Sequence, residues 1–208
     1  MSPVGSHLRP AARLRLAVVA AVLGAVGGAL IWILWVLPIV ASVDRAEPQP
    51  LGDAIVVDLD ADERAGIWAQ GISANLGTLE CVVVAPGGEP VAQRGAPALD
   101  WSSTLWWMTP KPGFEQTAQF TAPAAGPHEV RCADSLDIYD GAFLIAGDSF
   151  GGGSIGLGRG GGADYPIGTM LSFGAVFLPP FAVAVTIIVL IRVGASRRTR
   201  RRAEGMAA

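Results

Sequence analysis

Two long segments without charged residues constrain this chain most. Residues 16–43 and 166–191 contain no Asp, Glu, Lys or Arg. Each is longer than the roughly 20 residues that a helix needs to cross a bilayer. We therefore predict two transmembrane helices, preceded by a basic arm over residues 1–15 and followed by a basic tail over residues 192–208.

The charge between these segments differs in sign from the charge at the two ends. Residues 44–165 hold 17 of the 18 acidic residues but only six of the 15 basic ones, and Glu204 is the one acidic residue elsewhere. Basic residues beside a span stay on the cytoplasmic side. The pattern predicts a plasma-membrane protein with both termini in the cytoplasm and an acidic, extracytoplasmic segment 44–165. An acidic segment also argues against a nucleic-acid partner.

The first apolar segment has an alternative interpretation as a cleaved secretory signal. Arg9, Arg13 and Arg15 precede it, as basic residues precede such signals. The apolar run is about twice as long as a typical signal core, and residues 39–41 make a poor cleavage site. These features favour a retained helix.

Small residues recur at every fourth position of the first span, at Ala20, Gly24 and Gly28. Such stripes allow two helix backbones to approach closely. The partner helix is either the second span of the same chain, a second copy, or another membrane protein.

Both predicted spans contain proline. Because proline cannot continue the helical hydrogen-bond pattern, Pro38 predicts the end of the first helix. The pair Pro179-Pro180 predicts a kink in the second.

Short runs of alternating apolar and polar residues fill much of the segment between the spans, which predicts an all-β domain. We expect a polar connector over residues 44–53, a β-sandwich over 54–147 and a flexible glycine-rich tether over 148–165. The candidate strands are residues 54–59, 65–69, 79–84, 90–93, 104–107, 114–121, 129–133 and 142–146.

Cys81 and Cys132 are the two cysteines of the chain, and both lie in the segment placed outside the cell. An even count in an oxidising compartment predicts one disulfide; the alternative is two buried free thiols. If the strand faces that carry them point inward, the bond bridges the core. The companions expected on those faces and in the core are Leu79, Val83, His128, Val130, Leu59, Ile67 and Phe120.

Groups suited to catalysis are scarce in residues 44–165. His128 and Lys111 are the only histidine and lysine there, and no nucleophile motif accompanies them. We expect a strand-start histidine at position 128, no enzymatic activity and no cofactor.

Asp58, Asp60 and Asp62 alternate as the ligands of a calcium loop do. An EF-hand loop beginning at Asp58 requires Gly and Glu where this chain has Glu63 and Ala69. These aspartates are weak candidates for a metal site, and a solvated turn is the alternative.

Trp101, Trp106 and Trp107 form an aromatic segment. On a strand, Trp106 and Trp107 point to opposite faces, so at least one of them faces solvent, a ligand or a partner. Tryptophan is enriched at binding hot spots. The alternative is that both are covered within the domain or by the bilayer surface.

Three stretches carry a resemblance to known proteins: residues 59–68 (LDADERAGIW), 81–91 (CVVVAPGGEPV) and 120–132 (FTAPAAGPHEVRC). They resemble the pre-peptidase C-terminal type of β-sandwich and two-span actinobacterial membrane proteins of unknown function with a similar module. The resemblance implies a sandwich over about residues 54–147 and no catalytic residues. His128 stands where that family commonly has tyrosine.

Together these features predict a non-enzymatic membrane protein that presents a disulfide-stapled β-sandwich for protein–protein interaction. It is an accessory or scaffold subunit in contact with the bilayer and with another membrane protein or a second copy. The alternative is a module that binds envelope glycan or another ligand through the tryptophan-rich segment.

Overall fold

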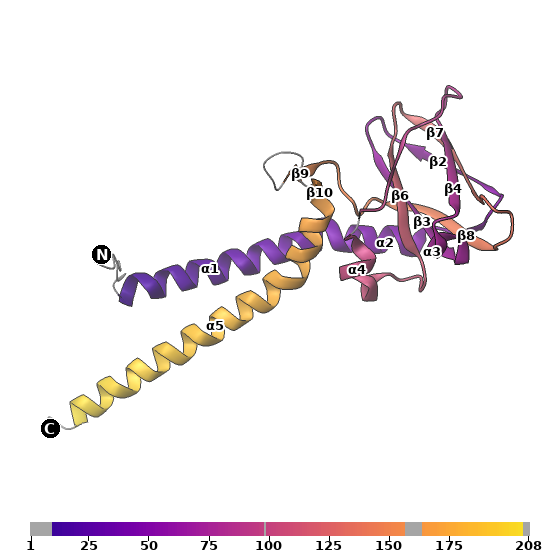
Figure 1. Cartoon of the computed structure of the whole chain (residues 1–208). Helices are drawn as coiled ribbons and strands as arrows, with labels where there is room; N and C mark the ends of the chain where they lie inside the picture. Colours follow the sequence, from indigo (N-terminus) through magenta and orange to yellow (C-terminus); the bar gives the residue numbers. More distant parts are fainter. Residues whose placement is uncertain (1–9, 98, 157–163, 206–208) are drawn as a thin grey trace, which may run out of the picture. The chain divides into compact units, whose positions relative to one another are not determined.

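A computed structural model describes residues 10–97, 99–156 and 164–205. The chain divides into a helical unit, Met1–Trp32 with Gly174–Ala208, and a β-rich unit, Ile33–Phe173 (Figure 1). The β-rich unit contains every strand of the described residues.

The first long helix consists of α1 (Pro10–Ile31), a π-helical turn η1 (Trp32–Val36) and α2 (Leu37–Arg45). The prediction that Pro38 ends this helix is wrong. Pro38 is the second residue of α2, directly after the π-helical turn η1, and the chain stays helical to Arg45. Burial of Ile39 and Val43 in the β-rich unit stabilises the turns that follow.

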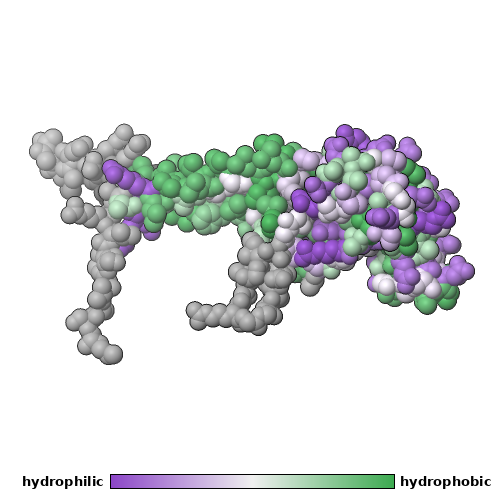
Figure 2. Space-filling view, turned by 90° about the horizontal axis from the view of Figure 1, so that it is seen from above, coloured by the Kyte–Doolittle hydropathy of each residue, from purple (hydrophilic) through white to green (hydrophobic). Residues whose placement is uncertain are grey.

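The second long helix, α5 (Ile167–Gly205), continues through Pro179 and Pro180. Residues Ala12–Arg45 and Ile167–Ala195 are long and apolar enough to cross a membrane. Large apolar side chains such as Leu23 and Leu190 are exposed along them, and Figure 2 shows these helices as mostly hydrophobic. The structure is therefore compatible with a two-span membrane protein that carries a β domain.

Two antiparallel sheets build the β domain. The larger has the strand order β1-β8-β3-β6-β5 and the smaller β2-β7-β4. The bounds are β1 Gln49–Pro50, β2 Ala54–Leu59, β3 Arg64–Gly71, β4 Leu79–Val84, β5 Gln93–Gly95, β6 Glu115–Thr121, β7 Gly126–Asp134 and β8 Gly141–Gly147. A separate pair joins β9 (Ser154–Gly156) to β10 (Asp164–Pro166).

One apolar core includes residues of both sheets. Leu59, Ile67 and Phe120 are buried in it, which confirms the predicted core companions. Val130 and Cys132 of β7 are also fully buried, so the predicted inward face of that strand is confirmed. Strands β2, β3, β4, β6, β7 and β8 each contribute side chains to this core.

The strand predicted over residues 104–107 is wrong. Helix α4 (Trp101–Thr104) and the 3₁₀ turn η2 (Trp106–Met108) occupy this segment. Asp100 caps α4, because its Oδ1 accepts hydrogen bonds from the backbone N–H and the hydroxyl of Ser103. Two smaller differences are the short helix α3 (Ile72–Leu76), which was not predicted, and β5, which begins at Gln93 instead of ending there.

The connector and the tether are more ordered than the sequence predicts. The helix reaches Arg45, and β1, which pairs with β8, begins after only three intervening residues. After β8, Ser149 and Phe150 are buried. The expectation of a flexible tether is therefore wrong for its first residues; residues 157–163 lie outside the described part.

Candidate functional site

The disulfide between Cys81 and Cys132 is present. The two residues are register partners on the neighbouring strands β4 and β7, with Cα atoms 4.1 Å apart. The bond therefore links two neighbouring strands of the smaller sheet. Cys132 is buried in the core and Cys81 packs against it, so the bond lies at the core as expected, but it does not cross it.

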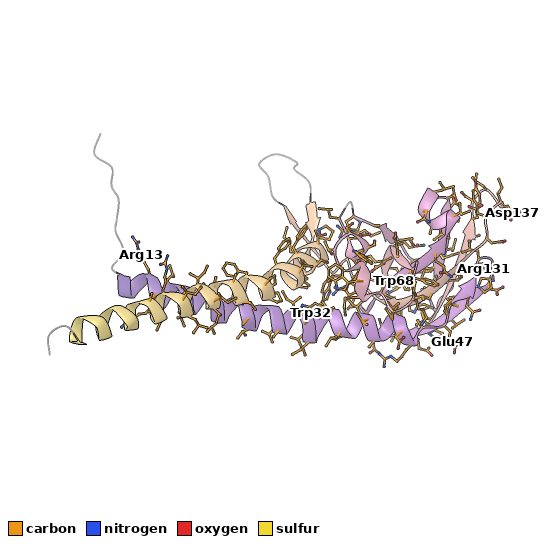
Figure 3. The ribbon with its side chains drawn as sticks, turned by 90° about the horizontal axis from the view of Figure 1, so that it is seen from below. Arg13, Trp32, Glu47, Trp68, Arg131 and Asp137 are labelled. Atoms are coloured by element: carbon orange, nitrogen blue, oxygen red, sulfur yellow. A yellow bond between two sulfur atoms is a disulfide. The ribbon has the colours of Figure 1, made fainter. Side chains whose placement is uncertain are left out.

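Trp101 is a buried contact between helix and sheet, not part of an exposed surface. It is 2% exposed, and its ring centroid lies 5.6 Å from Trp35 of η1 and 6.2 Å from Trp68 of β3. Its indole N–H donates to Thr109 Oγ1 at 3.0 Å, and that of Trp68 donates to the Gly147 carbonyl at 3.1 Å. Figure 3 shows Trp68 within the β domain. Trp101 is thus removed from the candidate partner surface.

Polar contacts hold the end of α2 against the β domain. Ser42 Oγ accepts a hydrogen bond from Gly147 N at 2.8 Å, and a Cβ at position 147 would lie 2.9 Å from that oxygen. Lys111 Nζ donates to the carbonyls of Val43 and Asp44, at the helix C-terminus, where a cation is favoured. Glycine at position 147 and lysine at position 111 therefore both serve helix docking.

A second polar cluster orders the chain between β8 and α5. The carboxylate of Asp148 accepts hydrogen bonds from Gln116 Nε2 at 3.0 Å and from the backbone N–H groups of Phe150 and Gly151. The Nε atom of Arg64 lies 3.6 Å from the same carboxylate. Gln116 Oε1 in turn accepts from the backbone and the hydroxyl of Ser149. The prediction of a flexible tether rested on glycine content, which carries no information on the hydrogen bonds of Asp148 and Gln116.

The first turn of α5 belongs to the β-rich unit and packs on the same segment. Gly168 N donates to the Phe150 carbonyl at 2.8 Å, and a Cβ at position 168 would meet the carbonyl of Ser149. Thr169 Oγ1 donates to the Leu99 carbonyl at 2.7 Å. Hydrogen bonds therefore hold the end of α2 and the start of α5 to the β domain.

Trp106 and Trp107 remain as the candidate partner surface. They are 66% and 51% exposed, and their rings meet edge to face with centroids 5.9 Å apart. Both are exposed because η2 is a 3₁₀ turn and not a strand. They line a groove of about 390 Å³ together with Ser102, Thr109, Pro112, Gly113, Phe114 and Glu115.

In the helical unit, the small-residue stripe of α1 lies against α5. A Cβ at Gly24 would lie 3.3 Å from Phe181 and one at Gly28 would lie 3.3 Å from Pro179. Ala20, one turn earlier, is half-buried. Of the three partners weighed for this stripe, the structure places the second helix of the same chain beside it.

Among the described residues, no group of three or more His, Cys, Asp or Glu side chains lies close enough to hold a metal ion. Asp58 ends up in β2, while Asp60 and Asp62 lie in the turn that follows. Glu63 Oε2 accepts a hydrogen bond from Asp60 N at 2.8 Å, so the acidic turn closes on itself.

Asp134, which with Asp137 and Asp140 forms a second acidic cluster in the sequence, is held by hydrogen bonds. Its carboxylate accepts hydrogen bonds from the hydroxyls of Thr78 and Ser73 and from the backbone N–H groups of Ile138 and Tyr139. These donors, with Thr78 the strongest, hold the pKa of Asp134 well below its usual range. The cluster joins α3 to the turn after β7, which is a structural role.

His128 lies in β7, and its side chain is fully buried. Its Nδ1 is 2.9 Å from the Gly126 carbonyl, and its ring lies beside Phe120. Lys111, as described, contacts helix carbonyls. His128 and Lys111 thus make separate structural contacts, the first within the β domain and the second at the end of α2.

No family model, curated protein or solved structure matches this chain. Its function is therefore inferred from the surfaces and contacts of the structure alone.

Proposed function

We propose that this chain is a non-enzymatic plasma-membrane protein with two transmembrane helices, which presents its β domain outside the cell to a partner protein. The partner-binding surface is the groove at Trp106 and Trp107. The exposure of these two adjacent indoles carries the proposal, because exposed tryptophan pairs are typical of binding hot spots.

The attachment of the β domain to its helices supports an accessory or scaffold role. Only three residues separate α2 from β1, and hydrogen bonds from Lys111 and Gly147 hold the end of α2. A partner that binds the β domain therefore binds it within a few residues of the apolar helix, close to the membrane, as in a membrane complex.

The proposal is tested by affinity purification of the full chain from membranes in mild detergent. The variant Trp106→Ala/Trp107→Ala should lose a stoichiometric partner that the unmodified chain retains. The matched control is Leu136→Ala/Ile138→Ala, which removes two side chains that are 52% and 70% exposed elsewhere on the β domain. Equal recovery of the partner with both variants, or recovery of the unmodified chain alone, would contradict the proposal.

A second candidate function is the binding of envelope glycan in the same groove. Ser102, Thr109 and Glu115 add polar groups beside the indole rings, a combination suited to sugar hydroxyls and faces. Tryptophan fluorescence of the full chain in detergent should then shift on addition of cell-wall fragments, and the shift should disappear in Trp106→Ala/Trp107→Ala. An unchanged spectrum at millimolar ligand excludes this alternative.

A further inference from the structure

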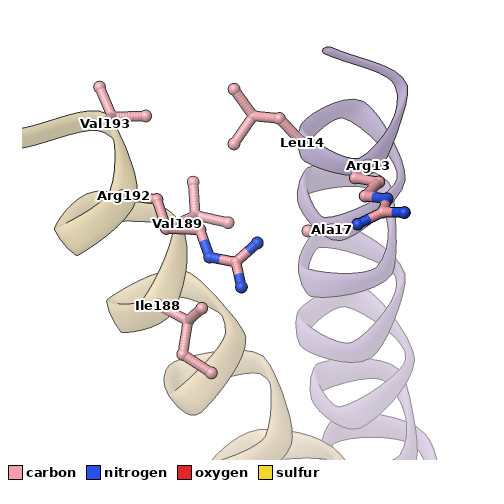
Figure 4. A pocket seen from close by; sticks show the side chains of 7 residues that line it. All are labelled: Arg13, Leu14, Ala17, Ile188, Val189, Arg192 and Val193. Carbon is pink, nitrogen blue, oxygen red and sulfur yellow. The ribbon is translucent and has the colours of Figure 1, made fainter. Parts of the chain in front are cut away.

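A cleft of about 320 Å³ opens within the helical unit between α1 and α5. It is lined by Arg13 of α1 and Arg192 of α5 and by apolar side chains that include Leu14, Ile188 and Val189. Figure 4 shows the guanidinium of Arg192 extending from α5 into the space between the two helices. The cleft therefore combines two cations with an apolar wall.

The composition of this unit leaves the two arginines without a carboxylate to neutralise them. Residues 1–43 contain no Asp or Glu, and Glu204 is the one acidic residue in 166–208. Within the described part of the chain, neither Arg13 nor Arg192 forms an ion pair. Guanidinium groups bind phosphate through paired, charge-assisted hydrogen bonds, and two of them beside one cleft favour an anion there.

We propose that this cleft binds one anionic phospholipid. Its phosphate lies between Arg13 and Arg192, and an acyl chain lies along Ile188 and Val189. The apolar wall selects a lipid over free phosphate, because free phosphate leaves that wall uncovered. The inference rests on the proposed insertion of both helices into a membrane, which brings these arginines to the level of the headgroups.

The test is native mass spectrometry of the full chain, purified in detergent and titrated with phosphatidylglycerol or phosphatidylcholine. The chain should retain one phosphatidylglycerol, and Arg13→Gln/Arg192→Gln should reduce retention by about 25-fold, since each basic residue near a headgroup contributes on the order of a fivefold preference. The matched control Arg15→Gln/Arg45→Gln removes the same charge from exposed residues outside the cleft and should retain the lipid.

Three outcomes overturn the site: equal loss in both double variants, equal retention of the two lipids, or displacement of phosphatidylglycerol by millimolar inorganic phosphate. Alkaline extraction of membranes tests the proposed insertion separately. Release of the chain into the soluble fraction contradicts the proposed function itself, whereas a membrane-retained chain with no preference for phosphatidylglycerol contradicts the lipid site alone.

Discussion

The indole N–H of Trp32 donates a hydrogen bond to the carbonyl of Ala175, with Nε1 and the oxygen 3.0 Å apart. In a regular helix this carbonyl would accept from the residue four positions later, which is Pro179 and has no N–H. Trp32 therefore satisfies a backbone group that Pro179 leaves open. Inside a bilayer, where water cannot substitute, such a contact matters more than at an exposed surface.

This relationship gives a double-mutant cycle. Trp32→Phe should destabilise the full chain by about 1–3 kcal/mol, because it leaves the Ala175 carbonyl unpaired. In a Pro179→Ala background the cost should fall by at least half, since an alanine in place of this proline supplies the missing N–H. Reversible unfolding in mixed micelles, followed by near-ultraviolet circular dichroism, measures both losses.

Pro180→Ala is the matched control for that cycle. It restores an N–H for the carbonyl of Val176 and not for that of Ala175. The cost of Trp32→Phe should therefore stay unchanged in the Pro180→Ala background. Equal relief by Pro179→Ala and Pro180→Ala would contradict the specific pairing of Trp32 with Ala175.

Substitution of Trp101 should destabilise the chain far more than substitution of Trp106. Trp101→Ala removes a buried side chain between Trp35 and Trp68 and should cost about 3–5 kcal/mol. Trp106→Ala changes an exposed side chain and should cost no more than about 0.5 kcal/mol. Chemical unfolding of the full chain in detergent compares the two, and similar losses would contradict the assignment of Trp101 to the core.

Local patterns allowed much of the β domain to be predicted. Residues 54–59 and 79–84 alternate between the core and the surface, and the structure gives β2 and β4 those bounds. The error at residues 104–107 had a local signal, because Asp100 precedes Ser102 and Ser103 as a helix cap does. Thr104, Trp106 and Trp107 are residue types common in strands, so the segment alone also fits a strand.

Other features depend on contacts between distant residues, which periodicity does not encode. Trp32 meets Ala175 across 143 positions, and Ser42 meets Gly147 across 105. The glycine-rich composition after β8 suggested a tether. The order of this segment comes partly from contacts of Asp148 with Gln116 and Arg64, which lie elsewhere in the sequence and leave no local signal. The exposure of both Trp106 and Trp107 likewise followed from a turn that the alternation rule did not anticipate.

The disulfide should account for a large part of the stability of the β domain. Cys81 and Cys132 are separated by 51 positions, and the chain-entropy treatment gives about 4 kcal/mol for a loop of this length. Cys81→Ala/Cys132→Ala should lower the free energy of unfolding by about that amount. Thiol labelling of the denatured, non-reduced chain should modify neither cysteine, and modification of both would contradict the bond.

Asp134 should make the stability of the β domain depend on acid pH. Its folded pKa lies below the unfolded value of about 3.9, so the unfolded chain takes up a proton first as the pH falls. The stabilisation is fully present above that unfolded pKa and is lost as the pH drops through the folded one. Denaturant unfolding of the full chain between about pH 6 and pH 2 should therefore show a steeper loss than in Asp134→Asn. Asp137→Asn, at an exposed carboxylate in the same turn, should keep the steep profile; a flattened profile in this control would assign the effect to net charge instead of to the hydrogen bonds from Thr78 and Ser73.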